Sequence, residues 1–187
     1  WPAAMLATST HDTKRSEDVR ARISVISELP EQWRKALTRW SRWNRRKKID
    51  VDDKPAPHRN EEYLLYQTLL GVWPFEPTED EGRKAHGERN GQARPSSSVF
   101  RPSSDFVERI QAYMVKAIRE AKVNTSWLNP NTTYDEAVRA FVAAILEDTP
   151  SNRFLADFHS LQATVAHFGA FNALSQTLLK LTSPGVP

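Results

Sequence analysis

The sequence predicts a mainly α-helical fold with about seven helices and one short N-terminal strand. Apolar residues recur every three or four positions in several long stretches, which is typical of helices with one buried face. Only residues 5–10 have the short apolar run expected of a buried strand. With 187 residues, 39% of them hydrophobic, the chain is long enough to bury a core.

Start and stop signals divide the first part of the chain. Hydroxyl side chains and prolines favour helix starts, and closely spaced prolines favour loops. The expected elements are a strand over 5–10, a helix capped by Ser16, a helix from Pro30 to about Lys47, a loop over 50–58 and a largely buried helix over 60–73.

The second part of the chain begins with a segment of different composition. Residues 82–104 are rich in Gly, Ser and Pro and poor in apolar side chains, which favours a flexible insertion loop. Helical periodicity resumes after it. The expected helices cover 106–121, a stretch that starts at Asn129-Pro130 or at Asn131 and runs to 145, a stretch that starts at Thr149-Pro150, and a last stretch to Leu181 that Gly169 separates from the one before it.

Composition excludes several classes of protein. The chain has no cysteine, which rules out disulfides, thiolate metal sites and cysteine nucleophiles and is compatible with a cytoplasmic protein. The histidines have no metal-ligand spacing, so we expect neither a metal nor a cofactor. No apolar run reaches the length of a membrane span, and no signal peptide is visible.

A basic helix raises the question of nucleic acid binding. Residues 33–48 contain eight Lys or Arg and no acid, with Trp33, Trp40 and Trp43 interleaved, and such a helix could follow a phosphate backbone. However, Trp33 and Trp40 fall on the apolar stripe of this helix, and the net charge of the whole chain is only +3. We therefore expect a core helix with a solvated basic face, and no nucleic acid partner.

The densest polar cluster, residues 8–18, follows the expected strand and precedes the first helix. In α/β barrels, active-site residues gather at the carboxyl ends of strands, and His11 and Asp12 are placed there. The alternative is a solvated turn whose Ser and Asp side chains cap the next helix. The spacing of the residues alone leaves both interpretations open.

The chain resembles the maltooligosyl trehalose synthase family, a branch of the α-amylase superfamily. Four strings of residues carry the resemblance, in the expected order and over nearly the whole chain, whereas residues 82–104 depart from the pattern. The strings are MLATSTHDTKRSEDVRAR from Met5, EYLLYQTLLGVWP from Glu62, KAIREAKVNTSWLNP from Lys116 and FNALSQTLLKLTSPGVP from Phe171.

This resemblance implies a fold, a reaction and a role for two residues. The chain would be an internal fragment of a (β/α)8-barrel isomerase of trehalose biosynthesis, which turns the reducing-end α-1,4 link of a maltooligosaccharide into an α,α-1,1 link. Asp12 matches the third carboxylate of the superfamily's catalytic site, and His11 matches the histidine that donates to the same sugar. The nucleophile and the proton donor of the family precede Trp1, so we expect this chain alone to be inactive.

Other residues of the matching strings are candidates for substrate binding. Lys14 and Arg15 could bind sugar hydroxyls or orient carboxylates, and a surface ion pair is the alternative for Lys14. Further along the chain, an indole face stacks well on a sugar ring, although tryptophans are mostly core residues. This second candidate cluster consists of Lys122, Ser126, Trp127 and Asn129.

The expected organisation follows from these assignments. Residues 1–15 would be the end of a barrel strand with its active-site turn, and the partners would be an α-glucan substrate and the rest of the parent barrel. The alternative function is a non-catalytic helical interaction module. Three further segments complete the division: a helical subdomain at 16–81, the insertion loop at 82–104, and a helical subdomain at 105–187 that leads back to the barrel.

Overall fold

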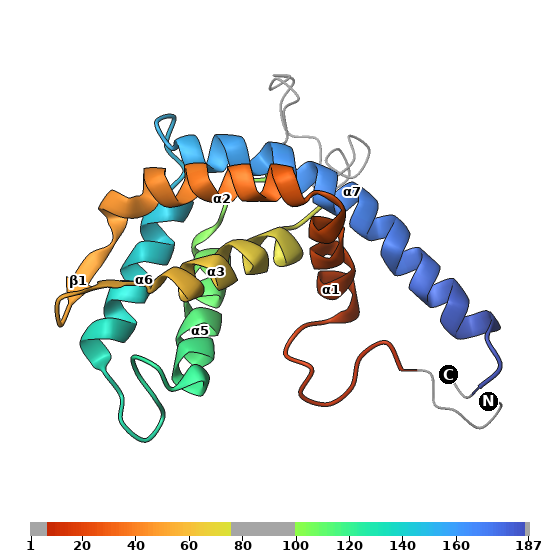
Figure 1. Ribbon diagram of the computed structural model, residues 1–187, viewed down its shortest axis with the longest axis horizontal. Coiled ribbons are helices and arrows are strands. Elements are labelled where there is room, and N and C mark those ends of the chain that lie inside the picture. The colour runs from red at the N-terminus through yellow and green to blue at the C-terminus, as the bar shows by residue number, and fades with distance from the viewer. Residues whose placement is uncertain (1–6, 76–99, 186–187) are drawn as a thin grey trace, which may run out of the picture.

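The computed structural model describes residues 7–75 and 100–185, and over these ranges the chain is mainly helical (Figure 1). A two-stranded antiparallel hairpin is the only sheet in the described residues. The α-helices are α1 (Glu17–Ser24), α2 (Pro30–Asn44), α3 (Arg59–Val72), α5 (Ser104–Ala121), α6 (Thr132–Leu146) and α7 (Arg153–Thr182); the strands are β1 (Ile49–Val51) and β2 (Lys54–Ala56).

The helices are arranged around one hydrophobic cluster. In Figure 1, α2 runs alongside the N-terminal half of α7, and α3 lies beneath them. The α5–α6 pair closes one side, and α1 packs against both α3 and α7 on the other. Trp40 lies at the centre with no exposed surface, in edge contact with Tyr66 at 5.3 Å and Phe154 at 5.4 Å between ring centroids.

Several predicted helices begin where the sequence places them. Pro30 occupies the first turn of α2, where its missing N–H costs nothing. Asn131 accepts a hydrogen bond from the Tyr134 amide at 3.0 Å and so caps α6. Trp33 and Trp40 are buried as predicted, which leaves the basic residues of α2 on the outside. Ser16 stands at the N-cap position of α1, but its hydroxyl donates to Asp18 and makes no cap hydrogen bond to the backbone.

Three other predictions are corrected. The predicted loop at 50–58 contains β2 and all but the first residue of β1, and the two strands pair through Ile49 and Ala56 at their far end. Residues 7–10 form no strand, and the described chain offers that segment no ladder partner, which a strand requires. Residues 5 and 6 of the predicted strand, and 82–99 of the predicted loop, lie outside the described residues.

The predicted break at Gly169 is wrong, because α7 continues through it as one helix of 30 residues. The glycine marks a close approach of two helices. A methyl group at Gly169 would come 2.5 Å from Cγ and 2.8 Å from Cα of Arg22 on α1. Gly71 on α3 has a similar place, since a methyl group there would come 2.6 Å from Cγ1 of Val19. Both glycines therefore let α1 lie close against its neighbours.

The division into subdomains at 16–81 and 105–187 stays a prediction. The hydrophobic cluster contains side chains from both segments, including Trp40 and Tyr66 from the first and Phe141 and Phe158 from the second. None of the helices in the described ranges combines the length and the apolar character needed to cross a membrane.

Replacing Gly169 by alanine should destabilise the chain. The added methyl meets the Arg22 backbone, and overpacking typically costs about 1–3 kcal/mol. Alanine regains up to about 1 kcal/mol of helix propensity, so we expect a net loss of about 1–2 kcal/mol in the free energy of unfolding, measured by urea denaturation. Gly71→Ala is the control, because its close contact is a side-chain methyl of Val19, and it should lose less. A Gly169→Ala chain as stable as the parent would contradict the packing.

Candidate active site

The turn before α1 holds the predicted catalytic pair. The Thr13 hydroxyl donates to the carbonyl of Thr10 at 2.5 Å and accepts from the Thr10 amide at 3.3 Å, which closes the turn. Asp12 and Lys14 flank Thr13 with φ angles of 65° and 67°. This left-handed region is unfavourable for residues other than glycine. Such conformations concentrate at functional sites.

Asp12 is exposed and ionised. Its side chain is 65% exposed, and its Oδ1 lies 2.6 Å from Nζ of Lys14. The hydrogen bond and the positive charge of Lys14 hold the pKa of Asp12 below its usual value. The same ion pair, together with Glu120, raises the pKa of Lys14. At neutral pH the turn therefore presents a carboxylate that can accept hydrogen bonds. His11 is exposed on the same turn.

Arg15 ties the turn to the helices. Its Nη2 donates to Oγ1 of Thr68 on α3 at 3.2 Å, and Thr68 is buried. A cavity of about 300 Å³ lies beside this contact, and Lys14, Arg15 and Tyr113 of α5 are among the residues that line it. Arg15 thus has a partner within the chain, which favours an orienting role over direct substrate contact.

The second predicted cluster forms the connection between α5 and α6. Lys122 ends α5 in the left-handed conformation, with a φ of 58°. The Ser126 hydroxyl accepts from the Asn129 amide at 2.9 Å, and the Ser126 amide donates to the Asn129 carbonyl at 3.2 Å, so these residues close a tight turn. Trp127 lies within that turn.

Trp127 is 56% exposed, so its alternative assignment to the core is wrong. The guanidinium of Arg119 lies 5.0 Å from the centre of its ring. Arg119 is itself fixed by Asp135, which accepts from its Nε at 2.9 Å and its Nη2 at 2.6 Å. The indole is therefore supported by an anchored cation and still exposes apolar surface to the outside.

The fold joins the turn at residues 10–15 to the end of α5 through a residue that the sequence analysis missed. Glu120, in the last turn of α5, lies 3.2 Å from Nζ of Lys14, and Lys122 follows two positions later. Glu120 belongs to the matching string that starts at Lys116, which was the only sequence signal for it. Glu120 and Lys14 lie far apart in the sequence, so no local pattern predicts that they pair.

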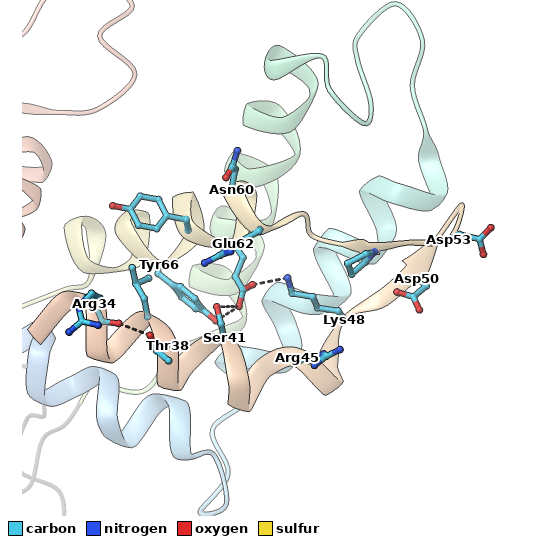
Figure 2. Close-up of a pocket in the computed structure, with 14 residues that line it drawn as sticks. Arg34, Thr38, Ser41, Arg45, Lys48, Asp50, Asp53, Asn60, Glu62 and Tyr66 are labelled. Carbon is cyan, nitrogen blue, oxygen red and sulfur yellow. Dashed lines mark hydrogen bonds and ion pairs between the residues drawn. The ribbon is translucent and has the colours of Figure 1, made fainter. Parts of the chain in front are cut away.

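A larger cleft, of about 1050 Å³, lies elsewhere, between α2, α3 and the hairpin (Figure 2). None of the predicted site residues lines it. Its wall carries both charge signs, including Arg34, Arg45, Asp50 and Asp53, and Glu62 stands at its base. The cleft is polar, and it is separate from the His11–Asp12 turn.

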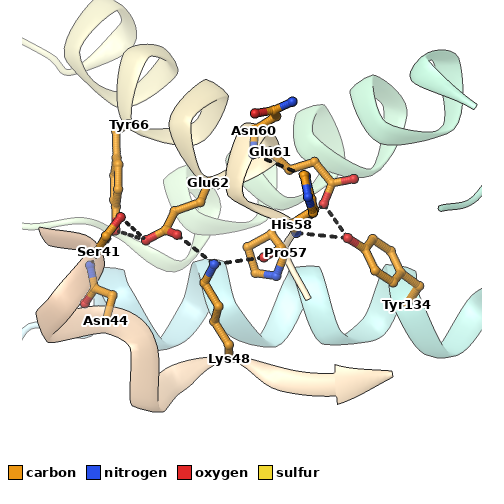
Figure 3. A network of polar contacts seen from close by, with 10 residues as sticks. All are labelled: Ser41, Asn44, Lys48, Pro57, His58, Asn60, Glu61, Glu62, Tyr66 and Tyr134. Carbon is orange, nitrogen blue, oxygen red and sulfur yellow. Dashed lines mark hydrogen bonds and ion pairs between the residues drawn. The ribbon is translucent and has the colours of Figure 1, made fainter. Parts of the chain in front are cut away.

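Glu62 is a buried carboxylate with a complete set of partners (Figure 3). It accepts from the hydroxyls of Tyr66 at 2.7 Å and Ser41 at 3.2 Å, and its Oε2 lies 2.7 Å from Nζ of Lys48. Lys48 also donates to the carbonyl of Pro57 at 3.0 Å. Burial raises the pKa of Tyr66, and the negative charge of Glu62 raises it further. With its oxygens bound, Glu62 serves to hold α2, α3 and the hairpin together.

A second carboxylate joins α3 to α6. Glu61 Oε2 accepts from the Tyr134 hydroxyl at 2.5 Å and from the His58 amide at 2.7 Å (Figure 3). Its Oε1 accepts from the Asn124 side-chain amide at 3.0 Å. Burial and the hydrogen bond to Glu61 raise the pKa of Tyr134. Asn124 lies two residues before Ser126, so this contact also helps to place the second cluster. Across 7–75 and 100–185, no three His, Asp or Glu side chains are grouped closely enough to hold a metal ion.

Known proteins resemble this chain over its whole length. A protein of Mycobacterium tuberculosis named "Putative maltooligosyl trehalose synthase" is 34% identical over 190 residues, which cover 100% of this chain and 20% of that protein. No profile of a known protein family matches the chain.

Solved structures agree in fold. The hypothetical maltooligosyl trehalose synthase of Sulfolobus tokodaii is 34% identical with a TM-score of 0.70, over 96% of this chain and 20% of that one. The maltooligosyltrehalose synthase of Arthrobacter ramosus is 31% identical with a TM-score of 0.67, over 100% and 19%.

The chain belongs to the maltooligosyl trehalose synthase family. It spans about a fifth of the length of the relatives that it matches and corresponds to a fragment of a maltooligosyl trehalose synthase. The resemblance expected from the four strings is therefore confirmed, and so is the mainly helical fold.

Replacing Lys48 by methionine should strongly destabilise the chain. The change leaves the buried Glu62 carboxylate without its cation, and breaking such a pair costs about 3–5 kcal/mol. We expect a loss of about 3 kcal/mol in the free energy of unfolding, measured by urea denaturation. Glu62→Gln in the same chain should recover part of the loss, because a neutral amide needs no counter-charge.

Lys35→Met on the exposed face of α2 is the control for that experiment. A surface substitution of this kind is expected to change stability by less than about 0.5 kcal/mol. Equal stability of the Lys48→Met and Lys35→Met chains would mean that the buried pair contributes nothing to the fold.

Proposed function

We propose that this chain is part of an intramolecular transglucosylase, which converts the reducing-end α-1,4 link of a maltooligosaccharide into an α,α-1,1 link. The observation that carries the proposal is the turn at residues 10–15 within a chain of this family. It exposes Asp12 as a carboxylate beside Lys14. The product would be an oligosaccharide that ends in a trehalose unit.

The role proposed for Asp12 follows from the transition state. Cleavage of a glycosidic bond with retention uses a nucleophile and an acid about 5 Å apart and passes through an oxocarbenium-like state. Hydroxyls near the anomeric carbon become better donors as positive charge develops. A fixed carboxylate that accepts from them is therefore bound more strongly in the transition state than in the ground state, and that difference accelerates the reaction.

The neighbours of Asp12 would bind and orient the sugar. His11, exposed on the same turn, would donate to a hydroxyl of the sugar that Asp12 holds. Lys14 would keep Asp12 ionised and could contact the substrate with its exposed ammonium. Arg15 would fix the turn through Thr68.

The connection between α5 and α6 would supply a second contact for the glucan. Trp127 offers an exposed indole face, and apolar faces of this kind stack on sugar rings. The side chains of Lys122, Ser126 and Asn129 surround it in the chain and could bind hydroxyls. The Lys14–Glu120 ion pair supports the assignment of both clusters to one site.

The partner proposed for this chain is the rest of the parent enzyme. Past Gly169, the C-terminal half of α7 leaves the bundle (Figure 1) and carries exposed apolar side chains at helical spacing: Phe171, Leu174, Leu178 and Leu181. An apolar stripe of this kind is typical of a face that another part of a protein covers. This chain corresponds to about a fifth of the length of its relatives. A catalytic barrel in the rest of the parent enzyme would cover the apolar stripe.

The alternative, a non-catalytic helical module, is not favoured, because the relatives that match the whole chain are named as enzymes. A cytoplasmic location remains part of the proposal and rests on the absence of cysteine.

Asp12→Asn in the parent enzyme should abolish most of the turnover. The amide keeps the shape of the side chain and removes the charge that stabilises the transition state. Loss of one preorganised stabilising group costs about 3–4 kcal/mol, or roughly 10²–10³ in kcat. The measurement is formation of a terminal trehalose unit from maltopentaose, with thermal unfolding as a check that the variant folds.

Asp53→Asn is the matched control, since Asp53 is also exposed and also has a positive φ, of 60°, but lies in the hairpin. It should keep normal turnover. Near-normal turnover of Asp12→Asn would remove Asp12 from the mechanism.

The 187-residue chain alone should form no terminal trehalose unit. The reaction needs a nucleophile and an acid held in register with Asp12, and the resemblance places both in the part of the family that precedes this chain. Product formed by the purified chain from maltopentaose above a blank, and lost in Asp12→Asn, would overturn this assignment.

A further inference from the structure

We propose that Glu120 is a positioning residue for the catalytic turn, and that it acts on Asp12 through Lys14. The inference rests on the function proposed above for Asp12. Glu120 itself would touch neither the substrate nor the reacting atoms.

Lys14 stands between two carboxylates that come from different parts of the fold. Its Nζ lies 2.6 Å from Oδ1 of Asp12 and 3.2 Å from Oε2 of Glu120. The other oxygen of Glu120 lies 4.0 Å from Nζ of Lys116, one turn earlier on α5. The four side chains form a row of alternating charge that runs from the helix to Asp12.

The two ends of this row differ in rigidity. Glu120 belongs to an 18-residue helix that is fixed by five buried side chains, Phe106, Ile110, Met114, Val115 and Ile118. Asp12 and Lys14 lie on an irregular turn with two left-handed residues. The helix is therefore the fixed partner, and the turn is the part that needs fixing.

One exposed ion pair could not fix this turn. A single surface pair stabilises its own geometry only weakly, because solvent screens the charges and a lysine side chain has many conformations. A second carboxylate on a rigid helix restricts the lysine to one of them. Lys14 then holds one oxygen of Asp12 and leaves the other open to sugar hydroxyls.

Loss of Glu120 should reduce catalysis without removing any catalytic group. Lys14 would keep Asp12 ionised but would no longer hold it in one place, and a misplacement of about 1 Å can cost 10²-fold in rate. We expect Glu120→Gln to lower kcat by about ten- to a hundredfold in the parent enzyme acting on maltopentaose. KM should change little, because the contact with Asp12 strengthens mainly in the transition state.

A double-mutant cycle separates positioning from a general structural role. In a Lys14→Met background, Glu120→Gln should cost almost nothing more, since it acts only through Lys14. Glu108→Gln, exposed on the same helix, is the control and should leave kcat unchanged. Unchanged kcat in Glu120→Gln, or losses from Lys14→Met and Glu120→Gln that add in full, would overturn the proposal.

Hydrogen exchange of this chain tests the geometry without an activity assay. The Thr13 amide donates to the Thr10 carbonyl at 3.3 Å within the turn. If Glu120 orders the turn, hydrogen exchange of that amide should become about two- to fivefold faster in Glu120→Gln, as expected when a weak surface ion pair is lost. An unchanged exchange rate would overturn the positioning role.

Failure of the parent enzyme to form trehalose units would instead overturn the proposed function, and the exchange result would still decide the role of Glu120.

Discussion

The position of α1 is the constraint on which the candidate site depends. The helix lies against α3 and α7 because Gly71 and Gly169 have no side chains, and Arg22 fills the space at Gly169. Arg22 then donates to the Trp73 carbonyl at 2.6 Å, at the end of α3, and its guanidinium lies 4.1 Å from the ring centre of Phe75. Burial lowers the pKa of Arg22, but hydrogen bonding and ring contact offset the cost of that burial. The turn at residues 10–15 enters this helix directly, so a shift of α1 would move Asp12.

Two ion pairs that are buried or largely buried join elements of the fold. Lys48 and Glu62 connect the hairpin to α3, and Arg119 and Asp135 connect α5 to α6. These pairs are directional, unlike apolar packing, and a buried charge is costly when its partner is lost. They therefore set the register of elements whose apolar faces would tolerate several arrangements. The same principle, at a more exposed place, links Glu120 to Lys14.

Local patterns predicted the parts of the fold that local physics controls. The apolar period identified α2, α5 and α6. Pro30 marked the start of α2, and Asn131 was one of the two starts predicted for α6, because caps and first turns depend on adjacent residues alone. Gly169 was misread because its low helix propensity is visible in the sequence, whereas the close crossing with Arg22 is not. The hairpin was missed for a related reason: its strands have three residues each, too few for a period-two pattern.

As in the fold, some features of the candidate site were predictable from local motifs, and others depend on tertiary contacts. His11, Asp12 and Trp127 were found because they stand in matching strings, yet only the structure shows that Trp127 is exposed and that Glu120 reaches Lys14. In Figure 1, the segment before α1 and the C-terminal half of α7 extend from the same side of the helical layer, and the Asn172 side chain on α7 donates to the Ala21 carbonyl on α1 at 3.2 Å. Helix α1 thus connects the turn that exposes the Asp12 carboxylate to α7, which carries the exposed apolar stripe. Under the proposed function, a barrel that covered the stripe would also be brought to the turn that carries Asp12, so the packing that completes the fold of the parent enzyme would also complete the proposed active site.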